Sequence, residues 1–121
     1  MHELSVAESI WNILEDELKK LGSKKLISVK IVIGELSGVV PEALDFYLNL
    51  LKDEKGHSET KFVYQFVPVR FQCSSCSHVF TVDKPMFSCP QCGSTDVKII
   101  SGNEFYIEEI EVEDITIKQD E

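Results

Sequence analysis

Apolar side chains near the start of the chain recur at the spacing of an amphipathic helix. They are Ala7, Ile10, Trp11, Leu14, Leu18 and Leu21. The segment Ser5-Val6-Ala7-Glu8 fits a capping box, which predicts that this helix begins near Ser5. Gly22 predicts that the helix ends just before it, because glycine readily adopts the left-handed conformation that follows a helix.

A second helix is predicted to begin at Pro41, because proline is favoured in the first turn of a helix. Its apolar stripe is formed by Leu44, Leu48 and Leu51 and is expected to be widened by Phe46, Tyr47 and Leu50. Gly56 is expected to end this helix.

Three further segments have the β character of strands: residues 25–34, 60–71 and 104–117. Pro68 indicates a strand end or an edge strand, since proline cannot donate to a β-ladder. The economical arrangement is an α+β fold, a small α/β sandwich with two helices on a three-stranded sheet. It would carry an inserted zinc-ribbon domain.

This pattern predicts two domains. The first covers residues 1–70 and is completed by a returning strand within residues 103–121. The second is the cysteine-rich insertion, residues 71–102, in which segments 78–82 and 97–100 have the character of short strands.

All four cysteines lie in two C-x₂-C pairs, Cys73 with Cys76 and Cys89 with Cys92. Two such pairs at this separation are typical of a structural zinc site, because each tight turn directs two thiolates at one tetrahedral ion. Gly93 would let the second turn curl around its sulfurs. Four cysteines leave no open position for a substrate, so we expect a structural zinc ion and no catalysis at this site.

The spacing leaves three alternatives open: two disulfides, a redox dithiol and an iron–sulfur cluster. A cytosolic compartment would disfavour disulfides. We expect His78 to be a surface residue, although a supporting or substitute role at the zinc site is the alternative. His57 is expected to be an exposed loop residue.

The composition is that of a soluble globular protein, with 43% hydrophobic and 27% charged residues. No stretch is long enough for a membrane span, and no signal peptide is recognisable, so we expect a cytoplasmic protein. The net charge of −9 is concentrated in residues 102–121, which contain eight acids and one lysine. This charge disfavours nucleic acid as a partner and favours either a solvated face or a surface that attracts cations or a basic partner. Without a long apolar stretch, we expect no membrane partner.

The first three residues, Met1-His2-Glu3, combine nitrogen donors in an unusual way. The Met1 amine, the next amide nitrogen and the His2 imidazole can close two chelate rings on one ion, and Glu3 could add a fourth donor. A square-planar, nitrogen-rich site suits Ni(II) or Cu(II). The residue chemistry also allows a simpler interpretation, in which His2 has no role and Glu3 favours the positive end of a helix.

Several segments together resemble the HypA/HybF family, the nickel metallochaperones of [NiFe]-hydrogenase maturation. They are MHE followed by Ser5, IVIGEL around Val32 to Glu35, the two C-x₂-C pairs, and the GNE segment from Gly102 to Ile107. The resemblance runs the full length of the chain.

The resemblance implies Ni(II) as transported cargo, bound at Met1, His2 and Glu3, and a structural Zn(II) held by Cys73, Cys76, Cys89 and Cys92. It also implies a HypB-type GTPase and the hydrogenase large-subunit precursor as partners, and for some members urease. Some members have a histidine directly after the last cysteine, where this chain has Gly93.

These patterns lead to a nickel metallochaperone that is not an enzyme and is a monomer or weak dimer. The alternative is a zinc-ribbon protein-interaction module without nickel delivery. No nucleophile–base arrangement and no phosphate-binding glycine loop is recognisable in the sequence.

Overall fold

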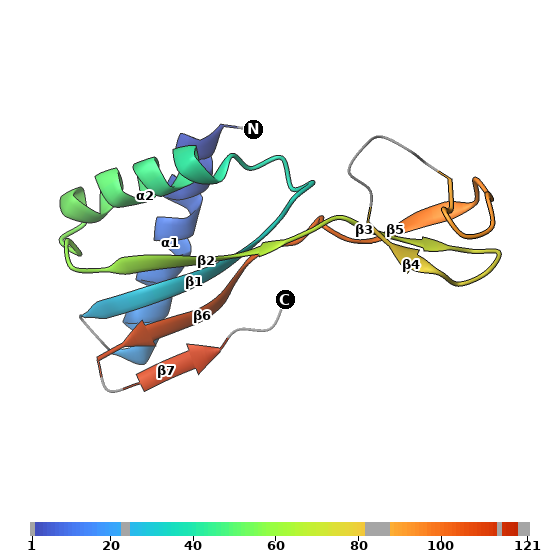
Figure 1. The fold of residues 1–121 in the computed structure, drawn as a ribbon. Coiled ribbons are helices and arrows are strands. Elements are labelled where there is room, and N and C mark those ends of the chain that lie inside the picture. The colour runs from blue at the N-terminus through green and yellow to red at the C-terminus, as the bar shows by residue number, and fades with distance from the viewer. Residues whose placement is uncertain (1, 23–24, 82–87, 114, 119–121) are drawn as a thin grey trace.

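The computed structural model describes residues 2–22, 25–81, 88–113 and 115–118. Its elements are α1 (Glu3–Leu21), β1 (Leu26–Gly34), α2 (Pro41–Glu54), β2 (Lys61–Val67), β3 (Arg70–Cys73), β4 (Val79–Phe80), β5 (Val97–Ser101), β6 (Phe105–Val112) and β7 (Ile115–Lys118). Figure 1 shows two lobes joined by a narrow connection. We call the part with both helices and strands β1, β2, β6 and β7 the helical lobe, and the part with β3, β4 and β5 the cysteine lobe.

The sheet of the helical lobe has the strand order β2-β1-β6-β7. Strand β1 is parallel to β2 and antiparallel to β6, and β6 and β7 are also antiparallel neighbours. The predicted fold class is confirmed. The sheet has one strand more than expected, because the segment predicted as a single strand, 104–117, folds back so that Val112 pairs with Ile115. Acidic and apolar residues alternate through this reversal, so the sequence pattern contains no break that would reveal it.

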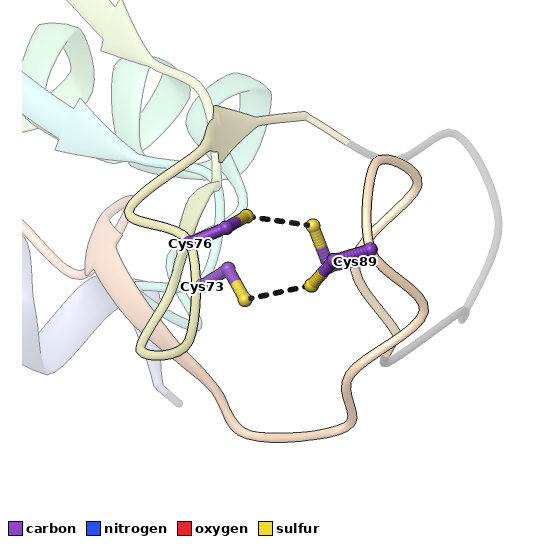
Figure 2. Close-up of side chains that lie close together, drawn as sticks. Cys73, Cys76 and Cys89 are labelled. Carbon is purple, nitrogen blue, oxygen red and sulfur yellow. Dashed lines mark hydrogen bonds between the residues drawn. The ribbon is translucent and has the colours of Figure 1, made fainter.

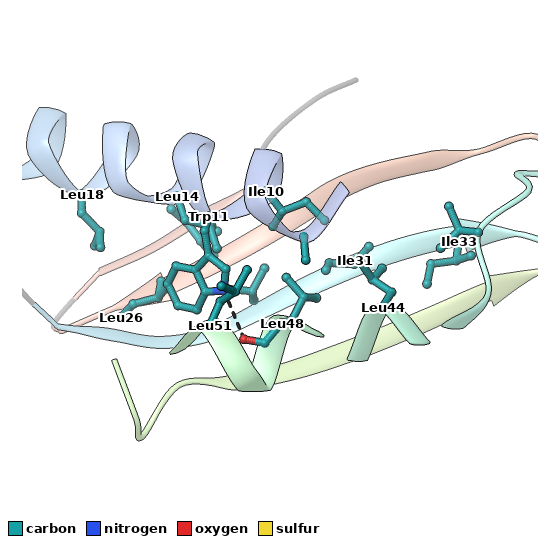
Figure 3. Packing of buried hydrophobic residues seen from close by; sticks show 14 of the residues in the cluster. Ile10, Trp11, Leu14, Leu18, Leu26, Ile31, Ile33, Leu44, Leu48 and Leu51 are labelled. Atoms are coloured by element: carbon teal, nitrogen blue, oxygen red, sulfur yellow. Dashed lines mark hydrogen bonds between the residues drawn. The ribbon is translucent and has the colours of Figure 1, made fainter. Parts of the chain in front are cut away.

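Both helices pack their apolar stripes into one hydrophobic core (Figure 3). Trp11 is completely buried, and its indole N–H donates to the Leu48 carbonyl oxygen at 3.1 Å. Thr60 is buried beneath the sheet end, and its hydroxyl donates to the Leu26 carbonyl oxygen at 2.7 Å. The core therefore has no unpaired indole or hydroxyl at these positions, which would otherwise be costly.

Helix α1 begins two residues earlier than the capping box predicted. His2 occupies the N-cap position in an extended conformation, and its carbonyl oxygen accepts from the Val6 N–H at 3.1 Å. Ser5 is exposed within the helix and does not cap it. The predicted end is confirmed, because Gly22 adopts the left-handed conformation with a φ of 67°.

Helix α2 begins at Pro41 as predicted, but its buried stripe is narrower than expected. Leu44, Leu48 and Leu51 are buried, whereas Phe46 is 61% exposed and Leu50 is 49% exposed. Tyr47 is half-buried and packs against the core as expected, whereas Phe46 and Leu50 are exposed, so apolar character alone does not determine burial on α2.

The segment predicted as one strand over residues 60–71 is divided between the two lobes. Strand β2 ends at Val67, directly before Pro68, and β3 begins at Arg70 in the other sheet. The expectation for Pro68 is confirmed, since β2 is also an edge strand. The two lobes have separate hydrophobic clusters, and the assignment of residues 71–102 as an independent domain stays a prediction.

No helix among residues 2–22, 25–81, 88–113 and 115–118 combines the length and apolar character needed to cross a membrane.

The two neighbouring faces of α2 provide a test of this packing. Leu48 is completely buried, and Leu48→Ala should lower the free energy of unfolding by about 2–5 kcal/mol, because it removes core contacts and leaves a cavity. Leu50→Ala on the exposed face should cost less than about 1 kcal/mol. Urea unfolding followed by circular dichroism measures both, and equal losses would contradict the described orientation of α2.

Candidate metal centres

The first C-x₂-C pair lies in a turn at the end of β3. The Cys73 N–H donates to the His78 carbonyl oxygen at 2.9 Å, and the Ser77 N–H donates to the Cys73 carbonyl oxygen at 2.9 Å. Ser77 takes a positive φ of 65°, so the chain turns back tightly after Cys76. These bonds hold both sulfurs on one side of the turn.

The second pair lies in a turn of the same design. The Gly93 N–H donates to the Cys89 carbonyl oxygen at 2.8 Å, and the Cys89 N–H donates to the Ser94 carbonyl oxygen at 2.8 Å. Gly93 has a φ of 77°, which glycine adopts without the steric cost that a side chain would bring. The predicted role of Gly93 in curling this turn is therefore confirmed.

The two turns bring all four thiols together (Figure 2). The Sγ atoms of Cys73 and Cys92 are 3.5 Å apart, those of Cys76 and Cys89 are 3.7 Å apart, and all four lie within 4.8 Å of one another. A tetrahedral ion with metal–sulfur bonds of about 2.3 Å requires sulfurs roughly 3.8 Å apart. The arrangement therefore fits one tetrahedral metal ion.

The same distances distinguish the site from two of its three alternatives, the disulfides and the iron–sulfur cluster. A disulfide needs a sulfur–sulfur distance of about 2.05 Å, and all four cysteines are free. A cluster of several irons bridged by sulfide needs a wider separation of the protein sulfurs than this group provides. Among metal-bound arrangements, these distances fit a mononuclear thiolate site.

The two thiols of the first pair have pKa values shifted in opposite directions. Backbone N–H groups of Cys76 and Ser75, with help from the Cys92 thiol, lower the pKa of Cys73 to about 6. The backbone N–H of His78 alone would lower the pKa of Cys76, but loss of hydration and the neighbouring sulfurs outweigh it and raise this pKa to about 12. The first thiol therefore ionises at the expense of the second.

The second pair repeats this asymmetry. Burial alone would raise the pKa of Cys89, but the backbone N–H groups of Cys92 and Gln91 outweigh it and lower this pKa. The Ser94 N–H favours the Cys92 thiolate, yet the adjacent Cys73 sulfur and burial raise the pKa of Cys92. Four thiolates this close repel one another, so a cation is required for all four to be ionised together.

His78 is not a member of the metal-binding group, which contains the four cysteines alone among the described residues. Its ring stacks on Phe80 with centroids 5.8 Å apart, and it is half-buried. The side chain thus supports the small cluster of the cysteine lobe, whereas its backbone bonds to both cysteines of the first pair. The side chain is half-buried and not a free surface residue, and a supporting role of His78 at the zinc site stays a prediction.

At the other candidate site, His2 is exposed immediately before helix α1. Met1, the third predicted nickel ligand with His2 and Glu3, lies outside the described residues. Glu3 is the first residue of the helix, and its Oε2 accepts from the Val40 N–H at 3.1 Å. This hydrogen bond, followed by the N–H of Glu3 itself, lowers the pKa of the Glu3 carboxyl.

The contact between Glu3 and Val40 joins residues far apart in the sequence. Val40 is the N-cap residue of α2, so the Glu3 carboxylate attaches the start of α1 to the start of α2. The sequence singled out Glu3 only as a metal donor or a helix-end charge. No pattern of residue types indicates a bond that spans 37 positions.

His57, expected to be an exposed loop residue, is half-buried and stacks on Trp11 with ring centroids 5.4 Å apart. The stack covers one face of the buried indole. No sequence pattern indicates this stack, because His57 follows Gly56 in a polar turn and only the tertiary fold places that turn over Trp11.

A sequence model of the family described as "Hydrogenase/urease nickel incorporation, metallochaperone, hypA" matches residues 1–112. The chain is 40% identical to a "Hydrogenase maturation factor HypA" of Caldanaerobacter subterraneus subsp. tengcongensis, over 93% of this chain and all of that relative. It is 41% identical to a protein of the same name from Solidesulfovibrio magneticus, also over 93% of this chain and all of that relative.

Two solved structures have the same fold. "Solution structure of HypA protein" superposes with a TM-score of 0.68 at 28% identity, covering 93% of this chain and 96% of that one. "Solution structure of the Ni metallochaperone HypA from Helicobacter pylori" superposes with a TM-score of 0.62 at 28% identity, covering 93% and 97%. This chain therefore belongs to the HypA family of hydrogenase and urease nickel-incorporation metallochaperones.

Proposed function

We propose that this chain binds Ni(II) at Met1, His2 and Glu3 and delivers it to the [NiFe]-hydrogenase large-subunit precursor, with urease as a possible second recipient. As a member of a metallochaperone family the chain is not an enzyme, as the sequence predicted. The observation that carries the assignment of the nickel site is the position of His2. Its side chain is exposed and lies at the N-cap of α1, outside the helix.

This position suits a cargo site. A short segment before a helix can wrap its backbone nitrogens around an ion, because the N–H groups of the first helical turn have no partner within the helix. Ni(II) favours such nitrogen donors in a tetragonal arrangement. Since the site is exposed, an acceptor protein can reach the ion and remove it.

The hydrogen bond of Glu3 assigns different roles to its carboxylate and its amide nitrogen. Its carboxylate is bonded to the Val40 N–H, so we assign it to holding the terminus against α2. We therefore assign the donor role of Glu3 to its amide nitrogen, next to His2 in the chain. Donors from Met1, His2 and Glu3 together would supply the nitrogen-rich set that Ni(II) prefers.

The four cysteines, Cys73, Cys76, Cys89 and Cys92, are proposed to hold a structural Zn(II) ion. Their sulfur spacing matches a tetrahedral thiolate site, and all four positions of the ion would be filled. Among the described residues, the buried core of the cysteine lobe consists of Phe71 and Phe80 with two of these cysteines, and we expect so small a core to depend on the metal for folding. We accordingly propose that residues 71–102 form a zinc-dependent domain beside the domain of residues 1–70 and 103–121.

The proposed partners are a HypB-type GTPase and the hydrogenase large-subunit precursor. The relatives are named hydrogenase maturation factors, which supports a hydrogenase protein as recipient. Free, closely spaced thiols suit a reducing compartment, and we propose that the chain acts in the cytoplasm.

Replacing His2 tests the nickel site. His2→Ala in untagged, zinc-loaded protein should lower nickel affinity by more than about 100-fold, because even residues that only support a metal ligand contribute 10–100-fold. Calorimetry and visible absorption measure the binding, and zinc content should stay at one ion per chain. His57→Ala is the matched control, since it removes a histidine that is far from the terminus in sequence and stacks on Trp11.

Equal nickel binding by the wild type and His2→Ala would contradict the assignment. Nickel binding by neither protein would favour the alternative function, a zinc-ribbon interaction module without nickel delivery. A tag on the N-terminus must be avoided, because it would remove the free amine of Met1.

Replacing a cysteine tests the zinc site. Cys89→Ser should abolish stoichiometric zinc binding and unfold the cysteine lobe, because structural zinc contributes about 10–16 kcal/mol in small zinc domains. Amide signals of the helical lobe should stay dispersed in the NMR spectrum. Ser75→Ala, in the turn between Cys73 and Cys76, is the control and should retain zinc.

The pH dependence of zinc binding follows from the thiol pKa values. Cys76 and Cys92 have raised pKa values, so both must lose a proton when zinc binds at neutral pH. Zinc loading should release protons, and zinc affinity should fall as the pH falls. Calorimetry in buffers of different ionisation enthalpy measures the release. Zinc binding without proton release would contradict the thiolate site, and so would a cysteine lobe that stays folded in the Cys89→Ser variant.

A further inference from the structure

The connection between the lobes, which we call the neck, consists of two chain segments that cross side by side (Figure 1). Residues 68–69 lead from β2 into β3, and residues 102–104 lead from β5 into β6. The hydrophobic clusters of the lobes share no residue. Among the described residues, the backbone contacts of the neck connect the two lobes, and we assign the orientation of one lobe relative to the other to them.

The segment that follows β1 binds both crossing segments through its backbone. The Glu35 N–H donates to the Val67 carbonyl oxygen at 2.9 Å, and the Leu36 N–H donates to the Gly102 carbonyl oxygen at 2.7 Å. The Gly34 N–H donates to the Glu104 carbonyl oxygen at 2.6 Å. Three consecutive residues of the helical lobe thus hold both segments that lead to the cysteine lobe.

Two carboxylates complete this arrangement. Oε1 of Glu35 accepts from the Val69 N–H at 2.9 Å, and Oε1 of Glu104 accepts from the Gly102 N–H at 2.7 Å. Val69 and Gly102 are the crossing residues, positioned next to Arg70 and Ser101 of the cysteine lobe's sheet. Each carboxylate therefore holds a backbone group at the point where the chain changes lobes.

The backbones in the neck are packed as closely as glycine allows. A Cβ atom at Gly34 would lie 2.2 Å from the Gly102 carbonyl oxygen, and a Cβ atom at Gly102 would lie 2.9 Å from Val69 Cα. Gly102 also has a φ of 112°, which is unfavourable for other residues. Such packing leaves little room for the neck to bend while its hydrogen bonds remain.

The same segment continues to the proposed nickel site. Residues 34–36 hold the neck, and four residues later the Val40 N–H is bonded to the Glu3 carboxylate. Within this loop the Ser37 N–H donates to the Gly34 carbonyl oxygen at 3.0 Å, and the Val39 N–H donates to the Ser37 hydroxyl at 3.3 Å. One short, internally bonded loop therefore connects the N-terminus of the chain to the base of the cysteine lobe.

We propose that Glu35 is a positioning residue for nickel delivery, because its carboxylate fixes the direction in which the cysteine lobe projects from the helical lobe. Glu104 acts with it on the second crossing segment. This inference rests on the proposed nickel function in one respect, that an acceptor protein contacts both lobes while it receives the ion. The lobe orientation itself depends on the neck alone.

The orientation can be measured by residual dipolar couplings of the zinc-loaded, full-length chain. In the wild type, couplings from both lobes should fit one alignment tensor. In Glu35→Ala each lobe should still fit its own tensor, but the common fit should be lost, because the cysteine lobe then reorients about its two connecting segments. Glu35→Gln should restore the common fit, since its amide oxygen can accept the same hydrogen bond from Val69.

Glu54→Ala is the matched charge control, because Glu54 is exposed at the end of α2 and remote from the neck in sequence. Glu104→Ala and Glu104→Gln form a second pair that tests the same idea if Glu35→Ala does not fold. A common tensor in the folded alanine variants would overturn the proposal. So would a loss of the common fit in Glu54→Ala.

Nickel transfer supplies a readout that a purely structural role would not move. Glu35→Ala should keep the nickel affinity of the wild type but transfer nickel more slowly to the hydrogenase large-subunit precursor, and Glu35→Gln should recover the rate. Unchanged transfer by a Glu35→Ala protein with reoriented lobes would overturn the positioning role. If neither the wild type nor any variant binds nickel, the proposed function would instead be overturned.

Discussion

The pairing of β1 with β2 on one side and with β6 on the other is the interaction on which the molecule depends. These two partners are separated by almost 40 residues, and both lead directly into the cysteine lobe. Because β1 lies between them and ends at Gly34, the two partners can approach each other beyond its end. The sheet of the helical lobe thereby forms the base from which the cysteine lobe projects. One face of the same sheet supports the two helices (Figure 1).

The two candidate metal centres differ in the way that their proposed roles require. The cysteine site is closed, with four sulfurs converging from two turns whose backbone groups are hydrogen-bonded. The terminal site is open, because His2 is exposed and its neighbour Glu3 is attached to α2 by one hydrogen bond. A structural ion needs the first arrangement, which slows its release, and a transported ion needs the second.

Much of the fold could be predicted from the sequence, and the errors share one physical cause. Helix α1 was placed from Ser5 because that residue suits a cap, but an earlier start was equally compatible with the local pattern. Strand β7 was missed because alternation continues through the reversal between Val112 and Ile115. Phe46 and Leu50 were assigned to the buried stripe by their apolar character, although the core contacts only one side of α2. In each case local preference allowed two outcomes, and contacts distant in sequence selected one of them.

The sequence alone determined the features that depend on spacing within a short segment. The two C-x₂-C pairs specify a candidate metal site because each pair forms its own turn, and the periodicity of residues 7–21 and 44–51 specifies two helices and their core faces. The tertiary structure decided the features that join remote backbone groups: the bond from Glu3 to Val40, the stack of His57 on Trp11, and the neck formed by Glu35, Val69 and Gly102. Such contacts depend on the position of a backbone N–H or a ring in space, and no residue type in the sequence encodes that position.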